Sequence, residues 1–249
     1  MSVCLANYRE SAAKAVRHFW RSRVGATKKQ AARGTVDQGE RSGVTGGKNL
    51  DGFVEMVRQV VCQNGLSDAN IHLTRQVLTL PGYFRPTKLW DMLVTNEGRL
   101  VAAVEFKSQV GPSFGNNCNN RVEEAIGNAV DLWTAFREGA LGESSRPFVG
   151  WLMVLEDCEK SRSPVADKSP HFPIFPEFSK AFYARRYEIL CRKLMQESLY
   201  SAASLILSPR SAAKSGAYSE LSETTGLGLF VAQLAGHVAA EAARPRAGN

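Results

Sequence analysis

A pair of β-strands joined by a short turn is the feature that most limits the possible folds of this chain. Residues 87–95 and 100–109 are both rich in apolar side chains, and residues 96–99 separate them. Gly98 can adopt the positive φ that a short hairpin loop with a bulge requires. We therefore predict an antiparallel hairpin that belongs to a sheet with at least one buried face.

The register of this hairpin decides which side chains share a face. Side chains alternate in direction along a strand, so Glu105 and Lys107 point to the same side. A register that pairs Asp91 with Glu105, and Leu89 with Lys107, places all three charged residues on one face. A shift by one residue would move Asp91 to the opposite face. The predicted register leaves a uniformly apolar second face, made of Met92, Val94, Ala102, Val104 and Phe106.

Two carboxylates and a lysine on one strand face are typical of a metal-dependent phosphodiesterase. Mg²⁺ prefers oxygen ligands, so Asp91 and Glu105 are the expected metal ligands. A metal held there would polarise the scissile phosphate and generate a hydroxide nucleophile. The Lys107 ammonium would orient the attacking water or stabilise the charge of the transition state. The alternative is a surface cluster on an exposed strand, because Glu-x-Lys alone is a common pattern.

Two further residues are candidates for the same catalytic face. Gln109 continues the face of Lys107. It would orient a metal-bound water or a phosphate, or would simply be a polar strand end. Glu55 lies on an amphipathic helix predicted over residues 49–63, beside its apolar stripe. It would be a further catalytic carboxylate, either as a metal ligand or as a partner of Lys107, or else a solvated helix residue.

An asparagine-rich segment follows the second strand and leads into a helix predicted over residues 121–138. Asparagine can contact adenine, and arginine can contact guanine, through paired hydrogen bonds in the major groove. Asparagine is also a good helix N-cap, which would account for one of the four asparagines. We predict that this loop contacts DNA, together with Gln109 and Lys88, through Asn116, Asn117, Asn119, Asn120 and Arg121.

The net charge agrees with a polyanionic partner. The chain of 249 residues has 31 Lys and Arg against 24 Asp and Glu, a net charge of +7. Such an excess is attracted to phosphates, although many proteins are mildly basic. Residues 25–48 are rich in glycine and are expected to form a loop or arm, either in contact with DNA or as a solvated linker. The basic residues of this arm are Lys28, Lys29, Arg33, Arg41 and Lys48.

The rest of the pattern predicts a mixed α/β fold in one domain spanning residues 1–249. That order of elements places helices on both sides of a small sheet. Helices are expected over residues 8–24, 49–63, 121–138, 177–206 and 220–243, strands over 71–79, 87–95, 100–109 and 147–155, and a loop over 157–176.

Several other functional classes lack their sequence signatures. The five cysteines form no C-x-x-C pair and the four histidines have no metal-ligand spacing, so we expect free thiols and no zinc site. There is no glycine-rich phosphate loop and no Gly-x-Ser-x-Gly elbow. The first ten residues lack a signal-peptide pattern, and no run of about 18 apolar residues occurs. We expect a cytoplasmic protein without a membrane segment.

The residues around the hairpin resemble the XhoI family of type II restriction endonucleases. The resemblance is carried by Leu80–Asp91 (Leu-Pro-Gly-Tyr-Phe-Arg-Pro-Thr-Lys-Leu-Trp-Asp), by Val104–Gln109 and by the segment Gly111–Arg121. It implies the PD-(D/E)xK nuclease fold, a restriction-endonuclease-like core in which helices flank a mixed β-sheet.

The same resemblance assigns roles to particular residues. It implies that Asp91 and Glu105 bind the metal and that Lys107 is the catalytic lysine. Trp90 stands where this motif often has proline, which weakens the match to the motif but not the chemistry. Glu55 matches an acidic residue often found on an upstream helix of this fold.

The resemblance also implies a specific activity. The expected reaction is Mg²⁺-dependent cleavage of double-stranded DNA at the palindrome CTCGAG, after the first C, leaving four-base 5′ overhangs. A two-fold target implies a homodimer, and a partner DNA methyltransferase would protect the host's own sites. Two alternatives remain open: a repair or junction nuclease of the same fold that recognises DNA structure, and a non-catalytic DNA-binding module.

Overall fold

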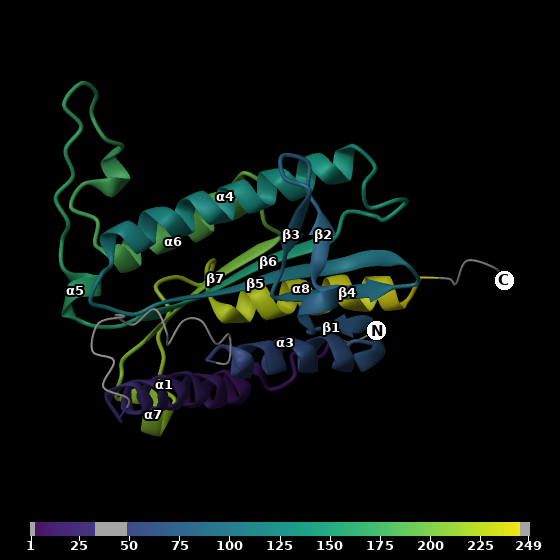
Figure 1. Ribbon diagram of the computed structural model, residues 1–249, viewed down its shortest axis with the longest axis horizontal. Helices are drawn as coiled ribbons and strands as arrows, with labels where there is room; N and C mark the ends of the chain where they lie inside the picture. Colours follow the sequence, from purple (N-terminus) through teal and green to yellow (C-terminus); the bar gives the residue numbers. More distant parts are fainter. Residues whose placement is uncertain (1–2, 33–48, 245–249) are drawn as a thin grey trace.

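The centre of the molecule is a five-stranded mixed sheet, seen in a computed structural model that describes residues 3–32 and 49–244 (Figure 1). Its strand order is β1-β4-β5-β6-β7. The pairs β1–β4 and β4–β5 are antiparallel, and the pairs β5–β6 and β6–β7 are parallel. The strands are β1 (Ile71–His72), β4 (Met92–Asn96), β5 (Arg99–Gln109), β6 (Phe148–Glu156) and β7 (Ala202–Ser208).

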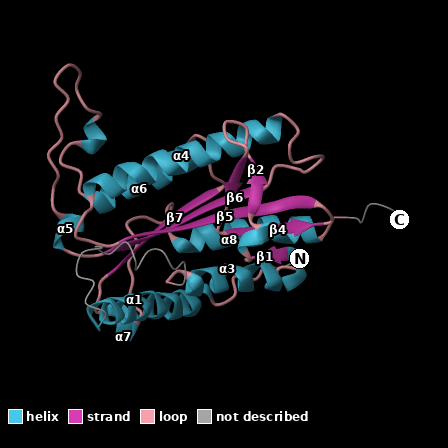
Figure 2. Ribbon diagram, viewed as in Figure 1, coloured by secondary structure: helices cyan, strands magenta, loops and turns pink. Residues whose placement is uncertain are grey.

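Helices cover both faces of this sheet, as the predicted fold class requires (Figure 2). On one face lie α1 (Tyr8–Ala32), α3 (Asp51–Gln63) and α8 (Leu227–Ala242), and on the other lie α4 (Gly115–Arg137) and α6 (Tyr183–Gln196). Shorter helical segments are α5 (Glu159–Arg162), α7 (Ala212–Ser215), and 3-10 turns at Asp68–Asn70, Arg75–Val77 and Pro176–Phe178. Mixed α/β architecture with a flanked sheet is thereby confirmed.

Each face of the sheet carries its own hydrophobic core. The predicted apolar face of the hairpin packs against α1, α3 and α8, in a core that includes Val104 and Phe106. The opposite face contributes Leu93, Ala103 and Trp151 to a second core under α4 and α6. Because both faces are covered, a charged side chain on β5 lies in a nearly dry layer and needs a partner.

The predicted register of the hairpin is confirmed along β4 and β5. Met92 pairs with Val104, and Leu93 pairs with Ala103, as expected. A bulge between Val94 and Thr95 shifts the pairing next to the turn. Gly98 has a φ of 76°, in the left-handed region that the loop was predicted to need.

The predicted strand over residues 87–95 is wrong as a single element. It divides into β3 (Thr87–Leu89) and β4, and β3 pairs with β2 (Thr79–Pro81) in a separate two-stranded sheet. Leu89 therefore lies opposite Thr79 and not opposite Lys107. The break between β3 and β4 contains Asp91, so this residue lies just outside the ladder.

Other predicted boundaries also change. The strand over 71–79 shrinks to β1 and a 3-10 turn, and the helix over 177–206 is replaced by α6 followed by β7. The predicted loop over 157–176 contains the short helix α5, and the final helix begins at Leu227 rather than near 220. The first part of the predicted arm, residues 25–32, continues α1. Arg33, Arg41 and Lys48 of that arm lie outside the described residues.

The state of the cysteines and the hydropathy of the helices can both be read from the structure. All five cysteines are free, as predicted. Across residues 3–32 and 49–244, no helix combines the length and the apolar character needed to cross a bilayer.

The contact between α1 and α3 depends on a glycine. A Cβ built on Gly52 would lie 2.7 Å from the Ala15 Cα, a backbone atom that cannot move aside. We expect Gly52→Leu to lower the free energy of unfolding by about 1–3 kcal/mol, because the two helices must separate. Urea denaturation would measure the change. Gly236→Ala, in α8, is the control. No atom lies within 4 Å of the added Cβ, so the free energy of unfolding should be unchanged or slightly higher.

Candidate active site

Asp91 is held where the chain leaves the main sheet. The β4–β5 ladder ends at the Met92–Val104 pair, so the next free amide of β5 has no strand partner on this side. The Asp91 Oδ2 atom accepts that hydrogen bond from the Phe106 N–H at 2.8 Å. The carboxylate is thus fixed by one oxygen while the side chain stays 44% exposed. It is oriented by the protein and remains open to a ligand.

Glu105 lies deeper, with no exposed surface. The Asn128 amide donates to both of its carboxylate oxygens, at 2.8 Å to Oε1 and 3.0 Å to Oε2. The Lys88 ammonium lies 2.6 Å from Oε1. A buried carboxylate is tolerated only when charge and hydrogen bonds compensate for lost hydration, and these two partners supply both.

Lys107 joins the two carboxylates. Its Nζ lies 3.8 Å from Asp91 Oδ2 and 3.8 Å from Glu105 Oε1. Because the two distances are equal and longer than a close ion pair, the ammonium lies between the acids without being bound tightly to either. The three side chains predicted to share a face are therefore gathered at one point, although Asp91 reaches it from a loop.

A cleft of about 850 Å³ opens beside this cluster. One wall is the start of α3 and the other is the end of β5, with Asp91 and Lys107 on its surface. The charged residues lining the cleft are Asp51, Glu55, Arg75, Asp91, Lys107 and Arg121.

Lys88 was predicted to contact DNA, but its side chain points inward. Its ammonium pairs with Glu105, donates to the Leu89 carbonyl and lies 5.1 Å from the centre of the Trp90 ring. In this arrangement Lys88 is the cation nearest Glu105. Its physical role is to neutralise a buried carboxylate, and we do not retain it as a DNA contact.

Gln109 is also enclosed rather than presented to a ligand. Its side chain donates to the Ser113 carbonyl at 3.1 Å and to the Phe114 carbonyl at 2.8 Å, and it accepts a hydrogen bond from the Tyr187 hydroxyl. The residue is 3% exposed. Gln109 therefore ties the end of β5 to the segment before α4, and we assign it no DNA contact.

The asparagine-rich segment is helical, which corrects the predicted loop. The helix α4 begins at Gly115 instead of near Arg121, and its N-cap is Phe114, which makes no side-chain capping bond. The alternative that an asparagine caps this helix is therefore wrong as well. Instead, the first turns of α4 present an exposed polar surface made of Asn116, Asn117, Asn119 and Asn120.

Arg121 follows these asparagines on α4 and lines the cleft that contains Asp91. Its guanidinium lies 2.5 Å from Glu124 Oε2. A basic residue that lines the same cleft as Asp91 is placed to meet an anionic ligand. The asparagine surface and the cleft are thereby joined along one helix.

Glu55 lines the same cleft from α3, on the wall opposite Lys107. Its carboxylate accepts hydrogen bonds from Arg58, at 2.7 and 2.9 Å, and from Gln59 at 2.9 Å. The hydrogen bonds from Arg58 lower the pKa of Glu55. In the described part of the chain no hydrogen bond or ion pair joins Glu55 to Lys107, so Glu55 stands at the rim of the site.

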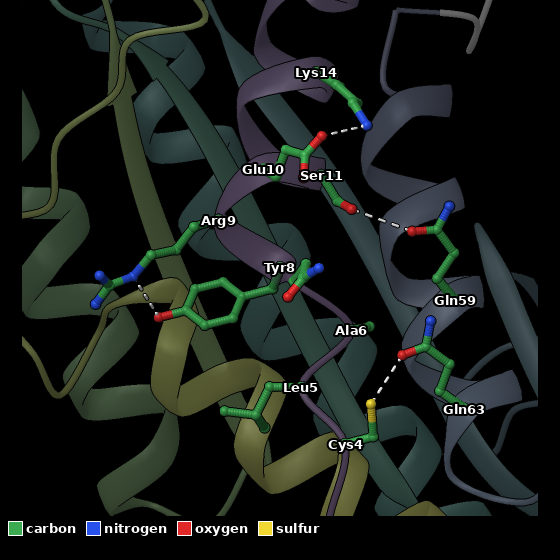
Figure 3. Close-up of a pocket in the computed structure, with 11 residues that line it drawn as sticks. Cys4, Leu5, Ala6, Tyr8, Arg9, Glu10, Ser11, Lys14, Gln59 and Gln63 are labelled. Carbon is green, nitrogen blue, oxygen red and sulfur yellow. Dashed lines mark hydrogen bonds and ion pairs between the residues drawn. The ribbon is translucent and has the colours of Figure 1, made fainter.

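A second pocket, near the start of α1, lacks the features of a catalytic site (Figure 3). Its polar side chains are paired with one another: Lys14 with Glu10 at 2.7 Å, and Ser11 with Gln59 at 3.1 Å. Glu10 is the one carboxylate among its lining residues. The cleft beside Asp91 is the better candidate.

Sequence reasoning missed two residues of the site. Asp51, in the first turn of α3, lines the cleft beside Glu55 and had no pattern to mark it. Asn128 contacts Glu105, and here a signal was present. It falls in the apolar stripe of its helix with Ala125, Ala129 and Leu132, and a polar residue in such a stripe must find a buried partner.

Comparisons with known proteins identify the family of this chain. The family model described as restriction endonuclease XhoI matches residues 29–220. The chain is 54% identical over 210 residues to the type II restriction enzyme XhoI of Xanthomonas vasicola, covering 84% of each chain. It is 59% identical over 172 residues to the type II restriction enzyme AbrI of Azospirillum brasilense, covering 69% of this chain and 77% of that one.

A third relative extends the comparison along nearly its whole length. The type II restriction enzyme BstVI of Geobacillus stearothermophilus is 49% identical over 212 residues, which are 83% of this chain and 94% of that one. No solved structure matches this chain.

Proposed function

The chain belongs to the XhoI family of restriction endonucleases, and from that premise we propose that it cuts double-stranded DNA at CTCGAG with Mg²⁺. It is a type II restriction endonuclease, a site-specific deoxyribonuclease. The proposed cut follows the first C of each strand and leaves four-base 5′ overhangs. One observation carries the catalytic part: Lys107 Nζ lies 3.8 Å from a carboxylate oxygen of both Asp91 and Glu105.

The donor set suits Mg²⁺. Asp91 and Glu105 offer hard oxygen ligands, and Mg²⁺ in phosphate-transfer sites binds one or two carboxylates and keeps several waters. No group of three or more His, Cys, Asp or Glu that could hold a metal occurs in the described residues. Water and phosphate oxygens would fill the other positions, as in sites built around a substrate. When bound, the ion would supply Lewis-acid activation of phosphate and water.

Lys88 sets a condition for metal binding. Its ammonium lies 2.6 Å from Glu105 Oε1, where it opposes a second cation by charge repulsion. We propose that Lys88 leaves this oxygen when the metal enters, while Asn128 keeps its hold on the carboxylate. Glu105 would then exchange the Lys88 ammonium for the metal, and its negative charge would stay balanced by a nearby cation throughout.

Lys107 is proposed as the catalytic lysine. Its ammonium, between the two acids and on the cleft surface, is placed to orient the water that attacks the phosphate. It is also placed to offset the negative charge that develops on the phosphate oxygens. Glu55 and Asp51 would act from the opposite wall, by holding waters near the metal.

The exposed start of α4 is the proposed surface for DNA contact. Asn116, Asn117, Asn119 and Asn120 can each donate and accept hydrogen bonds, and Arg121 connects them to the cleft. The basic residues of segment 25–48, which begins in α1, are proposed to contact the phosphates. The whole chain would then act as one nuclease domain around a single cleft.

Arg121 provides a prediction about sequence discrimination. We expect Arg121→Ala to reduce the preference for CTCGAG over a one-base variant by about 1–3 kcal/mol, because a lost base contact affects the matched site most. Competition binding without Mg²⁺ would measure both affinities. Arg137→Ala, at the far end of α4, is the control. Equal weakening for all sequences would assign Arg121 to phosphates instead.

We also propose a homodimer, because a palindrome presents two equivalent half-sites. Each copy would cut one strand. A DNA methyltransferase of the same specificity would act in the same cytoplasm and protect the host's own sites. Light scattering of the protein alone and with DNA would test the dimer, since a monomer in both states would contradict it.

Digestion of a sequenced plasmid tests the whole proposal. With Mg²⁺ we expect discrete fragments whose ends map to CTCGAG. A structure-directed nuclease of the same fold would give no sequence-defined fragments. A non-catalytic binding module would retard the plasmid in a gel without cutting it.

A further inference from the structure

A chain of hydrogen bonds, partly buried and passing through the half-exposed Arg85, connects the turn between β2 and β3 to the Glu105 carboxylate. It runs from the turn between β2 and β3 to Asp131, then to Arg85, Asn128 and Glu105. Asn128 and Asp131 lie on the side of α4 that faces the sheet and are 5% and 3% exposed. Such groups are costly to bury, so their complete pairing indicates a defined role.

Arg85 fixes which way the Asn128 amide points. The Arg85 guanidinium donates to Asn128 Oδ1 at 2.5 Å. A guanidinium has donors only, so the oxygen of the amide must face Arg85 and the nitrogen must face Glu105. The Asn128 NH₂ group therefore has one available orientation. In that orientation it donates to both oxygens of the carboxylate.

Asp131 in turn holds Arg85 and the turn between β2 and β3. Its Oδ2 accepts from Arg85 Nε at 2.7 Å, and its Oδ1 accepts from the backbone N–H groups of Tyr83 and Phe84 at 2.7 and 2.8 Å. Burial alone would raise the pKa of Asp131, but Arg85 and these amides outweigh it and lower the pKa. On its Gly82 side the carboxylate is closely packed, because a Cβ built on Gly82 would clash with Oδ2.

We propose that Asn128 is a positioning residue, which Arg85 and Asp131 orient so that it holds the Glu105 carboxylate ready for the metal. This inference rests on the proposed function, in which Glu105 binds Mg²⁺. Asn128 does not touch the reacting atoms. It sets the direction of the ligand's oxygens and remains bonded to them when Lys88 withdraws. Partners of metal ligands typically change metal affinity or activity by about 10–100-fold when they are removed.

The first test uses Asn128→Leu, which keeps the approximate side-chain size and removes both hydrogen-bonding groups. Mn²⁺ is titrated into the complex of the protein with a CTCGAG duplex. Electron paramagnetic resonance then measures the bound Mn²⁺ independently of cleavage. We expect the Mn²⁺ dissociation constant to rise about 10–100-fold and the single-turnover cleavage rate at a fixed low Mg²⁺ concentration to fall similarly. DNA affinity without metal should be unchanged, whereas a general structural defect would lower it as well.

A second variant keeps the proposal testable if Asn128→Leu does not fold. Arg85→Lys retains the positive charge beside Asp131 but lacks the second donor that reaches Asn128. We expect a smaller weakening of Mn²⁺ binding, up to about 10-fold. Arg137→Lys, an exposed arginine at the end of the same helix, is the matched control and should bind Mn²⁺ normally.

The outcomes separate this inference from the function on which it rests. Normal Mn²⁺ affinity in folded Asn128→Leu and Arg85→Lys would overturn the positioning role and leave the proposed nuclease intact. Absence of Mn²⁺ binding in the unmodified protein would overturn the metal-dependent function itself. Weaker binding in both variants, with the control unaffected, would support the inference.

Discussion

Asp91→Ala and Glu105→Ala are each expected to lower the rate of DNA cleavage by about 10³-fold or more, while binding to CTCGAG persists. Each variant removes one of the two carboxylates that the proposed metal requires, and one lost electrostatic group in an active site already costs about 10²–10³-fold. Binding to DNA should be equal or tighter, because a carboxylate facing the phosphates is gone. Single-turnover cleavage and gel retardation on one labelled duplex would measure both quantities.

The two variants should differ in their free energy of unfolding, and this difference separates a loss of catalysis from a loss of folding. Asp91 is half-exposed and bonds to one amide, so its loss should leave unfolding nearly unchanged. Loss of Glu105 leaves the Lys88 ammonium and the Asn128 amide without their buried partner, and breaking a buried pair costs about 3–5 kcal/mol. Glu105→Gln keeps the shape and is the better test of catalysis if Glu105→Ala unfolds.

Glu143→Ala is the matched control for both variants. This exposed carboxylate lies in the loop after α4, outside the cleft lining. It should cut and bind like the unmodified protein. Cleavage by folded Asp91→Ala at an unchanged rate would contradict the assignment of the site, since a metal ligand cannot be dispensable.

Lys107→Met is expected to reduce cleavage about 10²–10³-fold at every Mg²⁺ concentration. The methionine retains most of the apolar stem, so the change removes the ammonium that lies between Asp91 and Glu105. Without it, the two acids lose a shared counter-ion and the attacking water loses a partner. A Mg²⁺ titration under single-turnover conditions would separate a lower maximal rate from weaker metal binding.

Lys14→Met is the control for the loss of one positive charge. Lys14 is exposed on α1 and pairs with Glu10 away from the cleft. If both lysine variants weakened cleavage equally, the effect would reflect general attraction to DNA and not the position of Lys107. Full recovery of Lys107→Met at high Mg²⁺ would contradict a role in the chemical step.

The sequence was sufficient to predict the hairpin and its register because the pattern there is unambiguous. One face of β4 and β5 is uniformly apolar, and a shift of the observed register by one residue would separate Asp91 from Glu105 and Lys107. The sequence did not reveal that Asp91 lies in a break between strands. That break depends on the pairing of β3 with β2, a contact made by residues outside the hairpin.

The strand β7 was missed for a different reason. Its residues follow α6 closely, and both segments are buried, so their apolar residues read as one helical stretch. The chain turns between them at Ser198, whose φ is 55°. A serine in the left-handed region has no distinctive signature, whereas a glycine would have suggested the end of the helix.

The orientation of polar and charged side chains was harder to predict than their position. Lys88 and Gln109 were expected to meet DNA, yet both face inward because Glu105 and Tyr187 offer buried partners. Such partners come from distant segments of the chain. Asn128 shows the opposite case, since its place in an apolar stripe already indicated a buried hydrogen bond.

The most direct test is cleavage of an end-labelled duplex with one CTCGAG site, in Mg²⁺ and in excess EDTA, beside a duplex with one base changed. We expect cutting only of the intact site and only with Mg²⁺, with both strands cut after the first C. Asp91→Ala should bind the same duplex and leave it whole. Cleavage that persists in EDTA, or ends scattered along both duplexes, would contradict a metal-dependent, site-specific nuclease centred on Asp91, Glu105 and Lys107.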